Sequence, residues 1–369
     1  MLYYFNSVLN MIIKVVKRDK SRFFNLSEAI AWMRFPLILM IVMLHCYCAI
    51  DASGHSSYFA WVYPLGLWLG ETGVPAFFFI SGFLFFFSQK SYAQKLQTRF
   101  KTLLIPYLFW NALILLAYGM MEIIGHGVLI AGKNIADYNI IDYIRAFVDR
   151  GEWDRGNGVP MLCPYWYIRN LMALGVISPF LYYMVKYLKY PFILCLMVWW
   201  MVVPYNNMIA SSLLFFCLGA CFSIETINPV SLVRKFQRPL LVIWFIFFLT
   251  DWLTHVVVGG FSYGLIVHRM ALVTNIFVLL LLGSYCGSSN LSSLGLLNKS
   301  AFWIYTVHYP LTIFIGNIVA RYLSSSPDML LWLFYVMSVF LVTACCVVCY
   351  MVLHKCCPWI VSFSTGNRS

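Results

Sequence analysis

Apolar runs of membrane-spanning length recur along this chain from Trp32 to Leu353, with no long polar insert between them. A bilayer offers no water to backbone groups, so only helices and closed barrels can cross it. These runs do not alternate strictly between apolar and polar residues, which favours helices over barrel strands. The composition agrees, since 62% of the residues are hydrophobic and 10% are charged, against about a quarter charged in soluble domains. We therefore predict an all-α, polytopic membrane protein.

The polar and Pro/Gly-rich breaks between the apolar runs predict about ten transmembrane helices. The expected spans are residues 32–50, 73–88, 103–124, 163–184, 191–204, 209–224, 239–257, 265–285, 301–320 and 329–353. Lysine and arginine gather in the N-terminal segment and in the loops near residues 90–101, 186–189 and 234–238. Because such basic loops face the cytoplasm, an even number of spans places both termini there.

Three segments follow from this arrangement. Residues 1–27 are expected to be a basic cytoplasmic leader, residues 28–353 the transmembrane domain, and residues 354–369 a short cytoplasmic tail. The largest outer loop covers about residues 125–162 and carries charges of both signs. Such a segment is typical of a solvated loop with room for a short external helix, and it could also contact a polar acceptor such as a sugar.

The net charge of +12 does not indicate nucleic-acid binding, because the basic residues lie beside apolar runs where membrane topology accounts for them. Twelve cysteines lie mostly inside the expected spans, without the paired spacing of a zinc or redox site. We therefore expect neither a nucleic-acid partner nor a metal ion.

Two polar residues bracket an apolar stretch in the first span, which reads MRFPLILMIVMLHCY at residues 33–47. Arg34 and His45 are eleven residues apart, which is about 16 Å of helical rise and nearly three turns, so both side chains leave one face. Taken alone, Arg34 can snorkel to the headgroups and His45 can be a satisfied core residue. Together they predict a functional pair, in which Arg34 holds an anionic donor while His45 acts as a base deeper in the membrane.

Two further groups of candidates lie near the second and third spans. Ser81 and Gly82 form a small polar pair near the middle of the second span, which suits close helix approach or a bound ligand. Arg99 and Lys101 precede the third span. Membrane topology alone collects such cations, and a phosphate-rich ligand on the cytoplasmic face needs the same charges.

Other polar side chains are expected at membrane depth. Asp251 and His255 are four residues apart in the seventh span and share a helix face. The carboxylate therefore either orients the imidazole for function or forms a mutually satisfied pair with it. Trp166 and Arg169 stand at the outer end of the fourth span, where aromatic residues are also ordinary interfacial anchors. His308 lies within the ninth span.

Five fragments of the sequence, taken in order, resemble the acyltransferase 3 family of integral membrane acyltransferases, and together they cover about residues 28–320. They are Arg34 followed after ten residues by His45, VPAFFFISGF at 74–83, RFKTLLIPYLFWN at 99–111, PYWYIRNL at 164–171 and FWIYTVHYPL at 302–311. The resemblance implies about ten membrane helices and an O-acyltransferase. Such enzymes move an acyl group, usually acetyl, from cytoplasmic acyl-CoA to a hydroxyl, commonly on a cell-surface or exported glycan.

The resemblance also implies roles for individual residues. Arg34 and His45 match the family's arginine and histidine that activity requires, and Arg99 and Lys101 match its basic cytoplasmic patch. We add Ser81 to the donor-binding residues. The phosphates of acyl-CoA would then lie on the basic patch while the pantetheine arm runs towards His45, which either deprotonates the acceptor hydroxyl or takes the acyl group itself. The sequence leaves these two routes open.

The implied surroundings are a bacterial inner membrane, membrane lipids and a glycan or lipid-linked sugar acceptor. Many family members carry a soluble esterase-like domain after the membrane part, so with the short tail expected here a helper protein is expected to complete the transfer. Depth alone assigns the acceptor-side candidates, which are Trp166, Arg169, His308 and Asp251.

A different class of function also fits the intramembrane charges. In a polytopic transporter or flippase, Arg34, His45 and Asp251 would line a substrate path or a proton relay. The absence of recognisable repeated halves in the sequence argues against this alternative. A membrane scaffold without catalytic function is the third hypothesis, and the polar residues at membrane depth argue against it.

Overall fold

The computed structural model describes residues 24–50, 56–127, 129–130, 132–151, 158–204, 207–258, 261–287, 294–323 and 325–366. Within these residues the secondary structure is helical and no strand is present, apart from an isolated bridge between Ile130 and Lys133. The predicted all-α class is confirmed. Most of the predicted leader, residues 1–27, lies outside the described residues, and the first described helix begins at Phe24.

The α-helices in chain order are α2 (Phe24–Ala49), α3 (Ser56–Tyr63), α4 (Gly73–Phe87), α5 (Tyr92–Arg99), α6 (Ile105–Ile123), α7 (Ile140–Ala146), α8 (Trp166–Tyr183), α9 (Lys189–Val202), α10 (Met208–Ile224), α11 (Pro229–Lys235), α12 (Gln237–Leu253), α13 (Phe261–Cys286), α14 (Gly295–Tyr322), α15 (Asp328–Cys356) and α16 (Pro358–Thr365). Shorter π and 3-10 turns join several of them, namely η2 (Pro64–Leu69), η3 (Gly70–Thr72), η4 (Phe100–Leu104), η5 (Ile135–Asp137), η7 (Cys163–Tyr165), η8 (Met184–Leu188) and η9 (Thr254–Val258).

Eight helical stretches in the described part of the chain are long and apolar enough to cross a membrane. They are Asn25–Ala49, Tyr58–Phe87, Tyr92–Ile123, Cys163–Val202, Gln237–Val256, Leu265–Cys286, Gly295–Val319 and Asp328–Cys356. A ninth is present if α10 and α11, which are bent by 91° at their junction, count as one span. The polytopic membrane fold is therefore confirmed. The side of the membrane on which each terminus lies stays a prediction.

The count differs from the predicted ten at one clear place. The expected spans 163–184 and 191–204 fall within one helical stretch, Cys163–Val202. Lys186 and Lys189 mark a polar break in the sequence, but lysine is a good helix former, and helical turns continue through η8 to α9. At Lys189 itself the backbone has a φ of 46°, which interrupts the regular helical conformation there.

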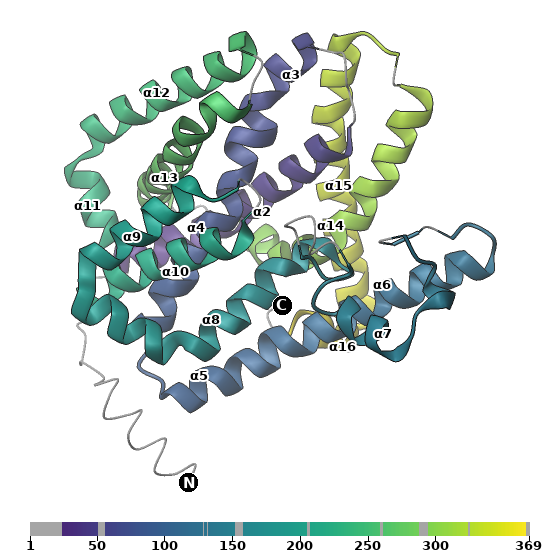
Figure 1. Cartoon of the computed structure of the whole chain (residues 1–369), viewed down its shortest axis with the longest axis horizontal. Helices are drawn as coiled ribbons and strands as arrows, with labels where there is room; N and C mark the ends of the chain where they lie inside the picture. The colour runs from purple at the N-terminus through teal and green to yellow at the C-terminus, as the bar shows by residue number, and fades with distance from the viewer. Residues whose placement is uncertain are drawn as a thin grey trace. The chain divides into compact units, whose positions relative to one another are not determined.

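The chain divides into two compact units, one containing residues 24–87 and 215–352 and the other containing residues 88–214 and 353–366 among those described. In the first unit, the N-terminal helix α2 packs against α14, α13, α4 and the turns η2 and η3. Helices α12 and α13 run beside each other in the same unit (Figure 1). Helix α2 therefore packs both on the segment that follows it and on α13 and α14, which come much later in the chain.

Helices α4 and α10 approach each other too closely for a side chain at their crossing. A Cβ atom on Gly82 would lie 2.0 Å from the carbonyl oxygen of Phe216, and one on Gly219 would lie 1.9 Å from that of Phe79. The Ser81–Gly82 pair of the sequence therefore marks a close helix contact through Gly82. Ser81 itself is partly buried.

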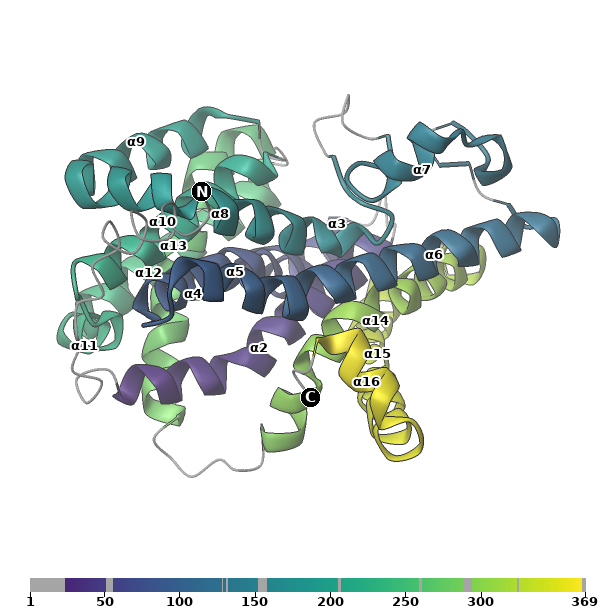
Figure 2. The ribbon, with the colours of Figure 1, turned by 90° about the horizontal axis from the view of Figure 1, so that it is seen from below.

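In the second unit, α5, η4 and α6 form one continuous helical run, which appears as the long dark-blue rod in Figure 2. Helix α8 packs against α5 and η4, and α16 packs against α6. Trp110 in α6 donates a hydrogen bond from Nε1 to the carbonyl oxygen of Ser364 in α16, at 3.0 Å. The residues predicted as a short tail thus contain a helix that contacts the membrane part.

The segment predicted as the outer loop, residues 125–162, folds around a small hydrophobic core in its described part. Ile130, Ile135, Ala146 and Met161 form that core, and α6 contributes Ile114, Leu115 and Tyr118. A short helix, which the sequence left open as an alternative to a plain solvated loop, is present as α7, and Asn139 and Asp142 cap its start reciprocally. The backbone N–H of Asn139 and the ammonium of Lys133 bond to the Asp142 carboxylate and hold its pKa below the usual value.

Candidate active site

His45 of α2 and His308 of α14 lie side by side in the first unit. Their ring centroids are 5.1 Å apart and their planes are tilted by 44°. The ring of Tyr309 meets His45 edge-on at 5.2 Å. His308 is fully buried, whereas His45 is partly exposed. Two residues that the sequence assigned to different roles therefore form one imidazole pair.

The hydrogen bonding of His308 determines which of its nitrogens carries the proton. Its Nδ1 lies 2.9 Å from the carbonyl oxygen of Ile304, one helical turn earlier. Because a carbonyl oxygen only accepts, Nδ1 is the protonated nitrogen of the neutral ring, and Nε2 is an acceptor with a free lone pair. This Nε2 is buried, and no hydrogen-bond donor reaches it among the described residues. Buried polar atoms in native proteins nearly always have a partner.

Arg34 lies on the same continuous helix as His45, since α2 remains helical through Pro36. Its side chain is exposed. The neighbouring residue links this part of α2 to α14, because the backbone N–H of Phe35 donates to Oδ1 of Asn298 at 3.1 Å. The Arg34 guanidinium is thus available to a headgroup or to an anionic ligand.

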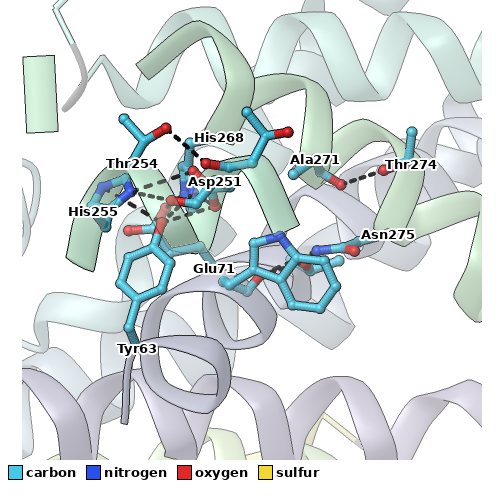
Figure 3. Close-up of polar contacts among 12 residues, drawn as sticks. Tyr63, Glu71, Asp251, Thr254, His255, His268, Ala271, Thr274 and Asn275 are labelled. Carbon is cyan, nitrogen blue, oxygen red and sulfur yellow. Dashed lines mark hydrogen bonds and ion pairs between the residues drawn. The ribbon is translucent and has the colours of Figure 1, made fainter. Parts of the chain in front are cut away.

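A second polar cluster in the same unit is centred on His268 of α13. Its Nδ1 lies 2.9 Å from Oδ2 of Asp251 in α12, and its Nε2 lies 3.0 Å from Oε2 of Glu71 in η3 (Figure 3). The side chains of His268 and Asp251 have no exposed surface, and that of Glu71 is 18% exposed. Since both ring nitrogens face carboxylate oxygens, only the imidazolium form can donate to both. A buried cation therefore bridges two acidic side chains.

Tyr63 and His255 complete this cluster. The hydroxyl of Tyr63 donates to Oδ2 of Asp251 at 2.8 Å, and its ring stacks on His255 with centroids 4.3 Å apart. Nδ1 of His255 lies 3.4 Å from Oδ1 of Asp251, so the two residues that share a helix face are in contact. We call the five residues the acid–histidine array: Tyr63, Glu71, Asp251, His255 and His268.

A neutral hydrogen-bond network holds Glu71 in place. Its turn, η3, is a 3-10 turn between the π-turn η2 and helix α4, and such breaks release backbone carbonyls from the helical ladder. Asn275 donates from Nδ2 to the carbonyl oxygen of Trp68 at 3.1 Å and to Oγ1 of Thr72 at 2.9 Å. In turn it accepts from Nε1 of Trp244 at 2.7 Å. The carbonyl oxygen of Trp68 thereby has a partner close to Glu71, whose carboxylate meets His268 of α13.

Sequence reasoning missed three members of the array, Tyr63, Glu71 and His268, and the buried Arg269 beside them. A signal was present, because an acidic residue between Gly70 and Thr72 and a His–Arg pair inside an apolar run are both rare at membrane depth.

The predicted donor-binding cations Arg99 and Lys101 belong to the second unit, whereas Arg34 and His45 belong to the first. Arg99 is half-buried and lies along α8, with Nη1 3.4 Å from the carbonyl oxygen of Leu171. Lys101 in η4 is exposed. Of the two, Lys101 has the more accessible charge.

Arg169 joins α8 to the segment that precedes it. Its Nη1 donates to the backbone carbonyls of Val148 and Gly158, while Nε and Nη2 both donate to Oδ1 of Asn170 at 3.1 Å. Most of its donors are therefore used within the protein. Trp166, at the start of α8, is half-buried.

No group of three or more His, Cys, Asp or Glu side chains among the described residues could hold a metal ion. The functional groups that the structure assembles are instead imidazoles, carboxylates and guanidinium groups in apolar surroundings.

The described part of the chain is thus an all-helical polytopic membrane protein with an imidazole pair between two of its helices. The chain belongs to the acyltransferase family whose profile, described as an acyltransferase domain, matches residues 27–351. This membership confirms the acyltransferase 3 resemblance and the prediction of an O-acyltransferase.

The chain was also compared with curated proteins. The chain is similar to the succinoglycan biosynthesis protein ExoH of Rhizobium meliloti (strain 1021), with 26% identity over 365 residues that cover 94% of this chain and 93% of ExoH. No solved structure shows significant similarity to this chain.

Proposed function

We propose that this protein transfers an acyl group from cytoplasmic acyl-CoA to a hydroxyl of a cell-surface or exported glycan. The proposed acyl group is acetyl. The reaction class rests on the family to which residues 27–351 belong. The glycan acceptor is supported by the relative, whose name places it in succinoglycan biosynthesis. The proposed location is the bacterial inner membrane, with membrane lipids around the helices and a helper protein completing the transfer.

The observation that carries the proposal is the imidazole pair of His45 and His308, with centroids 5.1 Å apart. Acyl transfer from a thioester to a hydroxyl needs a group that accepts the hydroxyl proton or carries the acyl group. Imidazole can do either, and the two rings lie on separate helices, so each can keep its own position during the reaction.

On the donor side, the phosphates of acyl-CoA would be bound by exposed Lys101, by Arg99 and by Arg34. Charge-assisted hydrogen bonds to phosphate suit both guanidinium and ammonium groups. Ser81 stays a proposed donor-binding residue beside the close contact made by Gly82.

On the acceptor side, Trp166, Arg169, His308 and Asp251 stay candidates. The hydrogen-bond partners of these side chains distinguish structural roles from a role in the reaction. Asp251 is held by three other side chains and Arg169 by backbone carbonyls, which favours structural roles for both. His308 keeps a buried nitrogen without a donor, which favours a role in the reaction.

The test is release of free CoA from acetyl-CoA by the purified protein in lipid, with and without a mixed cell-envelope glycan extract. We expect release that requires the extract and disappears in His45→Ala. His126→Ala is the matched control, since His126 is an exposed histidine outside the spanning stretches, and it should retain wild-type release. Absence of release by the folded wild-type protein, with a range of acyl-CoAs and acceptors, would refute the proposal.

One observation favours a second function. The acid–histidine array links titratable groups from three segments of the helical membrane part, and linked titratable groups of this kind form proton relays in transporters. A transporter or flippase would move substrate without consuming a thioester. Flux of the glycan precursor into protein-containing vesicles without acyl-CoA would support that alternative.

A further inference from the structure

We propose that His308 is a second catalytic residue, whose Nε2 takes the proton of the acceptor hydroxyl while His45 carries the acyl group. This inference rests on the acyl transfer proposed above and assigns a separate role to each imidazole. Three observations carry it: the tautomer of His308, its unpartnered buried nitrogen, and its distance from His45.

The first observation concerns the direction in which His308 can move a proton. The bond from Nδ1 to the carbonyl oxygen of Ile304 holds one nitrogen as a donor. Nε2 is therefore presented as a lone pair. A ring held in this tautomer cannot donate from Nε2 until it has first accepted a proton there, which is the property of a general base.

The second observation is that the lone pair has no donor. His308 has no exposed surface, and its Nε2 has no hydrogen-bond partner among the described residues. Leaving a buried acceptor without a partner costs about 1–3 kcal/mol. A histidine whose role was only structural would not need this second nitrogen, whereas a bound hydroxyl would satisfy it.

The third observation is the spacing of the two rings. A hydroxyl oxygen attacks an acyl carbon from about 3 Å, and it gives its proton to a base within about 3 Å. An oxygen placed beside two rings whose centroids are 5.1 Å apart can meet both conditions. The acylated nitrogen cannot serve as that base itself, because its lone pair is engaged in the bond to the acyl carbon.

The reaction balances in two steps. First, a nitrogen of His45 bonds to the thioester carbon, the C–S bond breaks, and the departing thiolate takes the imidazole N–H proton to become free CoA. Second, the acceptor oxygen bonds to the acyl carbon, its proton passes to Nε2 of His308, and the C–N bond to His45 breaks. His308 then returns the proton to His45, and both rings are neutral again.

Two variants separate the chemistry from folding. In His308→Asn the side-chain amide can still donate to the Ile304 carbonyl from the position of Nδ1, but the basic Nε2 is missing. In His45→Ala the acyl carrier is missing. Each purified protein in lipid is incubated with radiolabelled acetyl-CoA, and label on the protein is measured before and after addition of the cell-envelope glycan extract or of hydroxylamine.

We expect His308→Asn to become labelled with release of one CoA per protein, while its discharge to the glycan extract falls by about 100-fold or more. Hydroxylamine, which attacks acyl-imidazoles without a base, should remove the label from the wild type and from His308→Asn alike. A merely structural role would not produce this contrast. His45→Ala should take up no label.

Other results overturn the inference in distinguishable ways. Discharge to glycan at the wild-type rate by His308→Asn would show that His308 is not the base. Glycan acetylation by a wild-type protein that never carries label would show that His45 does not carry the acyl group. Failure of the wild type to release CoA under any condition would instead refute the proposed acyl transfer itself.

Discussion

Nε2 of His268 lies 3.0 Å from Oε2 of Glu71, although the two residues are 197 positions apart in the sequence. The other ring nitrogen of His268, Nδ1, lies 2.9 Å from Oδ2 of Asp251. One imidazolium therefore connects η3, α12 and α13, and it does so in the same unit as the His45–His308 pair. The array is a structural joint between helices as well as a set of titratable groups.

Removing the central cation of the array should destabilise the protein strongly. In His268→Ala, Glu71 and Asp251 lose their shared partner, and breaking a buried ion pair in this way costs about 3–5 kcal/mol. We expect a lower thermal unfolding midpoint in lipid or detergent. Tyr63→Phe removes one hydrogen bond and keeps the ring stacked on His255, so it should cost about 1 kcal/mol. Equal effects of the two variants would contradict this account.

The contact between α4 and α10 should tolerate no side chain at Gly82. A Cβ there would lie 2.0 Å from a backbone oxygen, and such overpacking costs about 1–3 kcal/mol or more. We expect Gly82→Ala to lower the yield of monodisperse protein and its unfolding midpoint. Gly295→Ala is the control, because a Cβ at Gly295 meets nothing within 4 Å. Unchanged stability of Gly82→Ala would mean that the helices do not cross this closely.

Lys101 should affect donor binding more than chemistry. Its exposed ammonium would meet a phosphate of acyl-CoA, and losing one such contact of about 1 kcal/mol raises a dissociation constant about fivefold. We expect Lys101→Ala to raise the KM for acyl-CoA at low salt while kcat stays near the wild-type value. The difference should shrink at high ionic strength, where exposed charges are screened. Lys133→Ala, whose lysine pairs with Asp142 outside the spans, should leave the KM for acyl-CoA unchanged.

Arg169→Lys should loosen the segment around α7. Lysine cannot reproduce the fork of hydrogen bonds that Arg169 makes to Val148, Gly158 and Asn170. We expect faster amide hydrogen exchange in the described parts of residues 140–162, with Arg145→Ala, an exposed change in α7, as the control. A raised KM for the glycan with unchanged exchange would instead identify Arg169 as an acceptor-binding residue.

The sequence alone was sufficient to predict the class of this protein and much of its secondary structure. The length and continuity of the apolar runs predict membrane helices, because backbone N–H and C=O groups in lipid can form hydrogen bonds only with other backbone groups of the protein. Helical periodicity likewise predicts the contact of Asp251 with His255, which are four residues apart on one helical stretch. It also predicts that Arg34 and His45 share one face of α2. The ordered motifs led to the family that residues 27–351 match.

Tertiary structure alone decided which helices share a site. It brings His308 to His45 and places Glu71 and Tyr63 against His268 and Asp251. In a soluble helix, the apolar face identifies the side that packs inward. In lipid, the outer face of a helix is as apolar as its packed face, so these sequences carry no comparable signal for which side meets a neighbour. Side-chain packing between helices therefore sets the pairing of residues nearly two hundred positions apart. The sequence pattern within a single helix does not predict this packing.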